Sequence, residues 1–148
     1  MHLLNIITIT SAGLMAGNEL AMSAFVNPAL RRLEGGPQAQ ALSVLASSLG
    51  RAMPVWYVLC LALLALESYL HLHQVTLAPL LIAAALWVGA IVLSISALVP
   101  INNRIASLNT AAPAPGWERE HRKWDALHRV RILLLIFALL MVVHALVA

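Results

Sequence analysis

Charged residues are scarce in this sequence: only 10% of its 148 residues are Asp, Glu, Lys or Arg, whereas 61% are hydrophobic. The mean hydropathy is +0.88. So little polar surface cannot cover a water-soluble domain of this size, and no separate basic domain is present to bind nucleic acid. We therefore expect an integral membrane protein, whose net charge of +3 attracts its connections to anionic lipid headgroups.

Cysteine is also nearly absent. The single Cys60 excludes an internal disulfide, and inside an apolar helix it is expected to act as a small packing residue. No Lys or Arg precedes the first apolar stretch, and polar residues interrupt that stretch. We therefore expect it to be a membrane span and not a cleaved signal peptide.

Four apolar stretches are long enough to cross a bilayer, which takes about 20 helical residues. They predict an all-α fold, a four-helix transmembrane bundle that forms one domain over residues 1–148. The last helix is predicted to begin near Trp117, well before its apolar part. The expected spans are residues 3–26, 53–72, 77–99 and 130–147.

A short stretch before the second span has the pattern of an amphipathic helix. Leu42, Leu45, Leu49 and Met53 follow one another at spacings of 3, 4 and 4 residues, which places them on one helical face. We expect residues 38–50 to form a short interfacial helix that covers the cytoplasmic side of the bundle.

The basic residues predict the orientation. All nine Lys and Arg residues lie in or beside the first and third connections, and the second connection has none. The positive-inside rule then places both termini and the turn around His73 outside. In a bacterium, the expected compartment is the cytoplasmic (inner) membrane.

Glu19 is the most informative residue within a span. It lies about two turns from the cytoplasmic end of the first helix, and Ser23 and Asn27 follow at four-residue steps. An ionisable group costs a few kcal/mol in a membrane, so Glu19 is expected to face the bundle interior and to mark a functional site. The alternative is a carboxylate that only holds a neighbouring helix by a hydrogen bond.

A stripe of aromatic, histidine and arginine side chains opens the last helix. Its members, spaced 4, 3, 4 and 3 residues apart, share one face of an α-helix. Tryptophan also favours the membrane interface, so the two Trp residues have a purely structural interpretation as well. The stripe consists of Trp117, His121, Trp124, His128 and Arg131.

Asn102 and Asn103 follow Pro100 at the cytoplasmic exit of the third helix. They either cap that helix end or present amide groups to a substrate. Alternating topology brings them to the same membrane face as Asn27. We expect a cavity there that binds a planar aromatic or quinone-like molecule.

Several short motifs resemble those of a known family. They are Ala16-Gly17-Asn18-Glu19, Val26-Asn27-Pro28, Val99-Pro100-Ile101-Asn102-Asn103 and Trp124-x3-His128-x2-Arg131. The pattern is similar to the anthrone-oxygenase-like family of small four-helix membrane proteins, many of whose bacterial members have no assigned function. The resemblance implies oxidation of an anthrone to an anthraquinone by molecular oxygen, without a cofactor.

That chemistry requires a base, a site for an oxyanion and a dry aromatic slot. His128 is the expected base, because an imidazole titrates near neutral pH, and Glu19 orients it or relays the proton. Arg131, with Asn102 or Asn103, is expected to hold the enolate oxygen. Trp117 and Trp124 would stack on the rings of a substrate that enters from the bilayer, with His121 and Asn27 beside it.

Two other classes of function remain open. A metal or haem site at the outer ends of the helices would use His2, Glu67, His71, His73 and His144, although these histidines form no specific ligand motif. A non-enzymatic binding or transport module would use Glu19 as its polar centre. The sequence is compatible with a homo-oligomer in each case.

Overall fold

The computed structural model describes residues 2–147, and these form four long helical rods. The first rod contains α1 (His2–Ala21), the π-helical segment η1 (Met22–Val26) and α2 (Asn27–Leu30). The second is α3 (Gly36–Leu70), and the third contains α4 (Leu77–Leu93), the π-helical η2 (Ser94–Leu98) and α5 (Val99–Ala106). The fourth is α6 (Trp117–Val147). The predicted all-α four-helix fold is confirmed.

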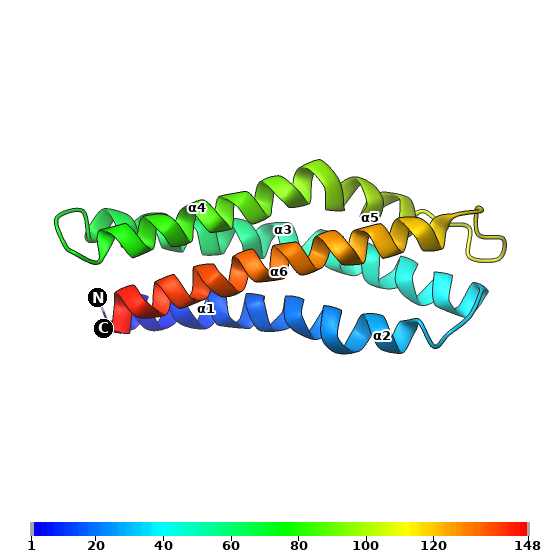
Figure 1. Ribbon diagram of the computed structural model, residues 1–148, viewed down its shortest axis with the longest axis horizontal. Coiled ribbons are helices and arrows are strands. Elements are labelled where there is room, and N and C mark those ends of the chain that lie inside the picture. Colours follow the sequence, from blue (N-terminus) through cyan, green and yellow to red (C-terminus); the bar gives the residue numbers. More distant parts are fainter. Residues whose placement is uncertain (1, 148) are drawn as a thin grey trace.

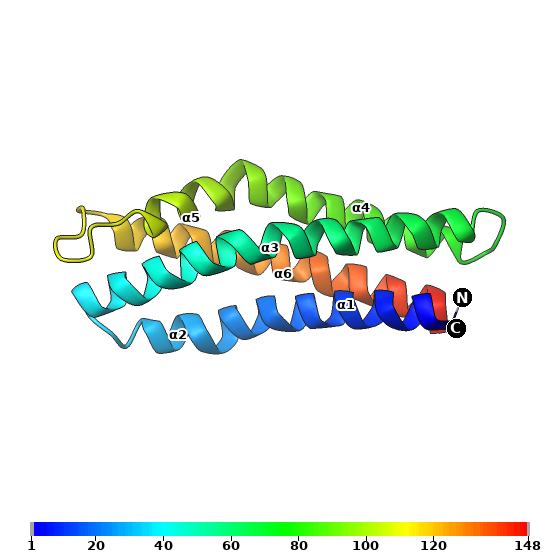
Figure 2. The same cartoon turned by 180° about the vertical axis from the view of Figure 1, so that it is seen from behind.

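The rods lie side by side in an up-and-down arrangement (Figures 1 and 2). Helices α1 and α4 each pack against both α3 and α6. The start of α1, the end of α6 and the turn at residues 71–76 lie at one end of the bundle, and the connections 31–35 and 107–116 lie at the other. The basic residues are therefore concentrated toward one end, as the orientation prediction requires, while the sidedness itself stays a prediction.

Within residues 2–147, three helices are long and apolar enough to cross a membrane: Gly36–Leu70, Leu77–Ala106 and Trp117–Val147. The first rod is less apolar because Asn5, Asn18 and Glu19 interrupt it. The predicted span at residues 3–26 is helical, but its crossing of the bilayer stays a prediction.

The structure corrects the expected interfacial helix at residues 38–50. These residues are helical, but they continue without a break into the second span, and α3 extends over 35 residues. Pro54, which lies inside α3, removes one backbone hydrogen bond and is tolerated within a long membrane helix. The stripe from Leu42 to Met53 therefore belongs to the bundle wall and lines the cavity described below.

Pro28 and Pro100 lie inside the first and third rods and do not end them. Each follows a five-residue π-helical segment, in which the N–H of Asn27 bonds to the carbonyl of Met22 and the N–H of Val99 bonds to that of Ser94. A proline ring clashes with the carbonyl four residues earlier in a regular α-helix, and a wider π-turn relieves this clash. Both rods therefore continue past their prolines, with a bulge at the level of the site.

Two apolar clusters hold the bundle together. The larger one fills the half near the termini and includes Met15, Leu64, Trp87 and Leu135, each fully buried. The smaller one, near the opposite end, contains Ala39, Leu42, Ala46, Ile101, Ile105 and Trp117. The polar residues of the candidate site lie between these two clusters along the helices.

Candidate functional site

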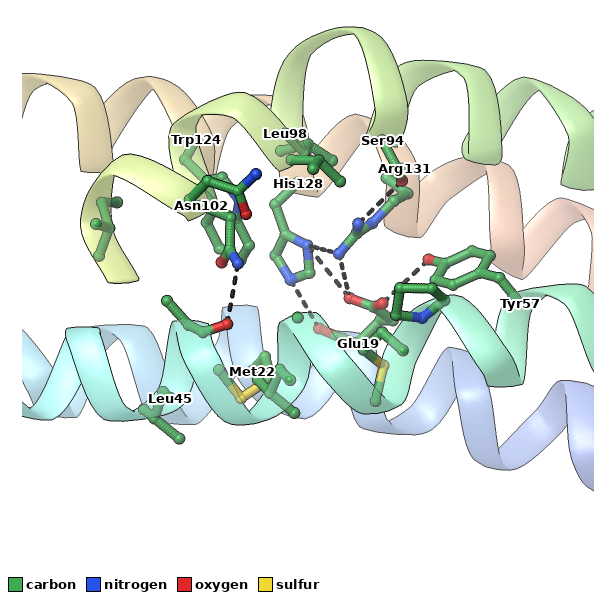
Figure 3. A pocket seen from close by; sticks show the side chains of 18 of the residues that line it. Glu19, Met22, Leu45, Tyr57, Ser94, Leu98, Asn102, Trp124, His128 and Arg131 are labelled. Carbon is green, nitrogen blue, oxygen red and sulfur yellow. Dashed lines mark hydrogen bonds and ion pairs between the residues drawn. The ribbon is translucent and has the colours of Figure 1, made fainter. Parts of the chain in front are cut away.

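Glu19 is the centre of a buried polar network that joins all four rods (Figure 3). Its Oε1 accepts a hydrogen bond from Tyr57 Oη at 3.0 Å. Its Oε2 lies 2.7 Å from Arg131 Nη2 and 3.3 Å from His128 Nδ1. Because Glu19 is 2% exposed, a carboxylate there requires such partners.

The contacts of His128 indicate which ring nitrogen carries the proton. Nε2 lies 3.2 Å from the main-chain carbonyl oxygen of Glu19, and Nδ1 lies 2.9 Å from Arg131 Nη2. A carbonyl only accepts and a guanidinium only donates, so Nε2–H donates to the carbonyl and Nδ1 presents its lone pair to Arg131. His128 is therefore a neutral imidazole whose Nδ1 lone pair accepts a hydrogen bond from Arg131.

Arg131 is held on several sides. Its Nη1 donates to Ser94 Oγ at 3.0 Å, and its guanidinium carbon lies 5.6 Å from the ring centroid of Tyr57. Ser94 in turn donates to the carbonyl of Ala90. The Nε–H of Arg131 is buried without a hydrogen-bond partner among the described residues, so one oriented cationic donor remains for a ligand oxygen.

Three rings of α6 form a stack along the cavity wall. The Trp124 ring lies 4.6 Å from that of His128, with an interplanar angle of 18°. On its other side it lies 6.1 Å from the ring of His121, at 13°. The stripe predicted from the sequence therefore presents a continuous aromatic surface from residue 121 to residue 128.

These groups line a cavity of about 260 Å³ with mainly apolar walls. The walls come from all four rods, and Leu45, Leu98 and Met22 are among the apolar lining residues. Val58 and Ile95 also line it and are 64% and 67% exposed. The cavity therefore reaches the apolar outer surface of the bundle between α3 and η2.

Eight of the nine residues expected to form a site line this cavity. The exception is Trp117, which packs in the smaller apolar cluster and does not contribute to the cavity wall. The reason is its position one turn before His121, at the level of Ala39 and Ile105. The eight residues are Glu19, Asn27, Asn102, Asn103, His121, Trp124, His128 and Arg131.

The three asparagines differ in their contacts. Asn27 is buried and donates to Asp125 Oδ1 at 2.9 Å, while Arg31 pairs with Asp125 Oδ2. Asn102 donates to the carbonyl of Ala46 on α3 at 3.0 Å. Asn103 is exposed at the cavity rim. Asn27 and Asn102 therefore brace the site through interhelical hydrogen bonds.

Sequence reasoning missed Tyr57 and Ser94, which belong to the Glu19 network, and Asp125, which binds Asn27 beside it. Asp125 lies four residues after His121 and three before His128, so the spacing of the stripe already indicated it. Tyr57 and Ser94 are polar groups inside expected spans, but isolated hydroxyls give no such pattern. Their roles depend on contacts with Glu19 and Arg131 from distant segments.

The histidines considered for a metal or haem site at the outer ends of the helices do not come together in one place. Across residues 2–147, no group of three or more His, Cys, Asp or Glu side chains is arranged to hold a metal ion. Glu67 is buried, accepts from Thr8 Oγ1 at 3.1 Å and lies 3.8 Å from His71 Nδ1, whereas His2, His73 and His144 are exposed. Glu67 therefore makes an interhelical contact with Thr8, and the three exposed histidines lie apart from it on the surface.

The fold and the site together define a helical bundle of the membrane type, with a buried carboxylate, imidazole and guanidinium at the inner wall of an apolar cavity. The anthrone oxygenase family model matches residues 40–141, and the chain belongs to that family. The matched region contains Tyr57, His128 and Arg131, whereas Glu19 lies before it. No curated protein and no solved structure matches the chain.

Proposed function

We propose that this protein is a membrane-embedded oxygenase that oxidises a planar aromatic ketone, an anthrone or a related quinol-like molecule, with molecular oxygen. The contact of Glu19 with both His128 and Arg131 at one wall of an apolar cavity carries the proposal. This arrangement of side chains combines a base and a cation in a site shielded from water. Membership of the anthrone oxygenase family supports the same reaction class.

The overall reaction converts the methylene group of the anthrone and one O₂ into a carbonyl group and one water. Removal of a methylene proton gives an enolate. The enolate passes one electron to O₂, and the two radicals combine to form a carbon–oxygen bond. The resulting peroxide takes up the first proton and then loses water together with the second methylene proton, which leaves the quinone carbonyl.

The residues supply the proton transfers and the charge stabilisation. His128 Nδ1 accepts the first proton, and Glu19 Oε2, 3.3 Å away, stabilises the imidazolium that forms. The free Nε–H of Arg131 binds the enolate oxygen. Tyr57, which donates to Glu19, keeps the carboxylate in place while the charge on the imidazole changes.

The cavity walls favour access from the membrane. Val58, Ile95 and Val99 line the cavity and are exposed on the outside of the bundle, where acyl chains would surround them. An apolar aromatic molecule therefore reaches the site laterally, between α3 and η2. We place the protein in the bacterial cytoplasmic membrane with the cavity in the cytoplasmic half and both termini outside.

Oxygen uptake by the purified protein tests the proposal. With anthrone as substrate, we expect consumption of one O₂ per anthraquinone formed, above the rate of uncatalysed oxidation. Glu19→Gln keeps the size of the side chain but removes its charge, and should lower the rate about 10²- to 10⁴-fold. Glu118→Gln, on the exposed side of α6, is the matched control.

Two results would contradict the proposal. One is a lack of anthrone-dependent oxygen uptake by folded protein, and the other is an unchanged rate in Glu19→Gln. Retained binding of anthrone without oxygen uptake would favour the non-enzymatic binding module instead.

A further inference from the structure

His121 is a buried histidine whose ring nitrogens are not used. It is 5% exposed, and neither Nδ1 nor Nε2 has a hydrogen-bond partner among the described residues. A buried imidazole normally has a partner for its donor and for its acceptor. His121 also lines the cavity, so a ligand that displaces the atoms around these enclosed nitrogens can supply the missing hydrogen-bond partner.

The polar groups around His121 are already paired with one another. Asp125, four residues further along α6, is bound by Asn27 and Arg31. The amide nitrogen of Asn102 donates to the carbonyl of Ala46. His121 is thus a buried lining residue at this end of the cavity whose two ring nitrogens have no partner among the described residues.

The distance between His121 and the Glu19 network indicates how long a ligand must be to reach both. His121 and His128 are seven residues apart on α6, about 10 Å along the helix axis at 1.5 Å per residue. Trp124 lies between them and stacks on both rings. The cavity thus has two polar ends joined by an aromatic wall, a spacing that suits a molecule of fused rings lying along the stack.

We infer that His121 determines substrate specificity by binding a hydroxyl or carbonyl oxygen on a terminal ring of the substrate, remote from the ketone held by Arg131. This inference rests on the proposed function, because it concerns the ligand of the same cavity. It assigns His121 a binding role and no part in proton transfer.

Binding of two product analogues tests this role. Anthraquinone and 2-hydroxyanthraquinone differ only in a hydroxyl on an outer ring, and their affinities can be measured by equilibrium dialysis against the detergent-solubilised protein. We expect the wild type to bind the hydroxylated molecule about five- to tenfold more tightly, the effect of one hydrogen bond in a buried site. His121→Phe, which retains a ring to stack on Trp124, should lose this preference while its affinity for anthraquinone changes less than twofold.

Two further variants test whether the preference for the hydroxylated molecule depends on a hydrogen-bonding group at position 121. His121→Gln supplies an amide donor and acceptor and should retain part of the preference. His73→Phe, at an exposed position in the turn at the opposite end, should retain all of it. Equal affinities of the wild type for the two molecules, or an undiminished preference in His121→Phe, would overturn the assignment of His121.

The proposed function fails in a different way. If the protein discriminates between the two molecules through His121 but shows no oxygen uptake with anthrone, the oxygenase reaction is wrong and the binding role of His121 stands. If oxygen uptake depends on Glu19 and the preference does not depend on His121, the reaction stands and the specificity role is wrong. The two measurements therefore separate the two claims.

Discussion

Arg131 on α6 and Glu19 on α1 lie 2.7 Å apart, from Nη2 to Oε2, although 112 residues separate them in the chain. The pair is almost fully enclosed, since the side chains are 10% and 3% exposed. Removal of one member of such a pair leaves an uncompensated charge in an apolar surrounding. The first and last rods are thus held together by the same contact that forms the candidate site.

Arg131→Lys should keep the positive charge but lose the planar arrangement of donors. Lysine cannot bind Glu19 and Ser94 and still offer an oriented donor to an enolate oxygen. We expect kcat/KM for anthrone to fall about 10²-fold, the usual effect of losing an oxyanion donor, while the protein stays folded. Arg129→Lys is the matched control, because Arg129 is 62% exposed. Equal rates for the two variants would show that Arg131 does not bind the oxyanion.

His128→Phe tests the proposed base while retaining the stack on Trp124. The phenyl ring has no nitrogen to accept a proton, so turnover should fall at least about 10²-fold. His128→Ala should also lose turnover, but His128 is fully buried, so the smaller side chain would leave a cavity and lower stability as well. Circular dichroism and thermal unfolding in detergent separate the two effects. A His128→Phe protein with wild-type oxygen uptake would exclude His128 as the base.

Asp125 is expected to stabilise the site without taking part in the reaction. It is 2% exposed and accepts a hydrogen bond from the buried amide of Asn27. Asp125→Ala leaves the Asn27 amide without its acceptor and should lower the free energy of unfolding by about 1–3 kcal/mol. Asp125→Asn keeps an acceptor and should cost less than Asp125→Ala. Oxygen uptake per folded molecule should stay within about twofold for both, and a larger loss in Asp125→Asn would give Asp125 a part in the chemistry.

Much of this structure followed from local patterns in the sequence. The four helices and the stripe from His121 to Arg131 depend on hydropathy and on helical spacing, which neighbouring residues determine. The contacts of Tyr57 and Ser94 with the Glu19–Arg131 pair join segments far apart in the chain, and no local pattern reports them. Likewise, no local pattern reports the π-turns before Pro28 and Pro100. A proline disrupts a regular α-helix, and the π-turns that compensate for it depend on the packing around them.

Gly50 and Gly17 are both helical, but a methyl group at each would meet different surroundings. A Cβ on Gly50 would lie 3.0 Å from the Asn102 amide nitrogen, whereas a Cβ on Gly17 would meet no atom within 4 Å. Gly50→Ala should push Asn102 away from the carbonyl of Ala46, and the loss of that bond should offset the gain in helix propensity. Gly17→Ala should raise the free energy of unfolding by about 0.5–1 kcal/mol. Thermal unfolding should therefore rank Gly17→Ala above Gly50→Ala, and the reverse order would contradict the proposed contact.

The orientation in the membrane can be tested at two positions that the structure places at opposite ends of the bundle. Lys123 lies on α6 beside the connection 107–116, and His73 lies in the turn between α3 and α4 (Figure 1). Because the basic residues are concentrated toward the end that contains Lys123, the positive-inside rule places that end in the cytoplasm. In a Cys60→Ala background, a membrane-impermeant maleimide added to intact cells should label His73→Cys, and should label Lys123→Cys only after the membrane is opened. Labelling with the opposite sidedness would place the cavity in the outer half of the membrane and overturn the proposed topology.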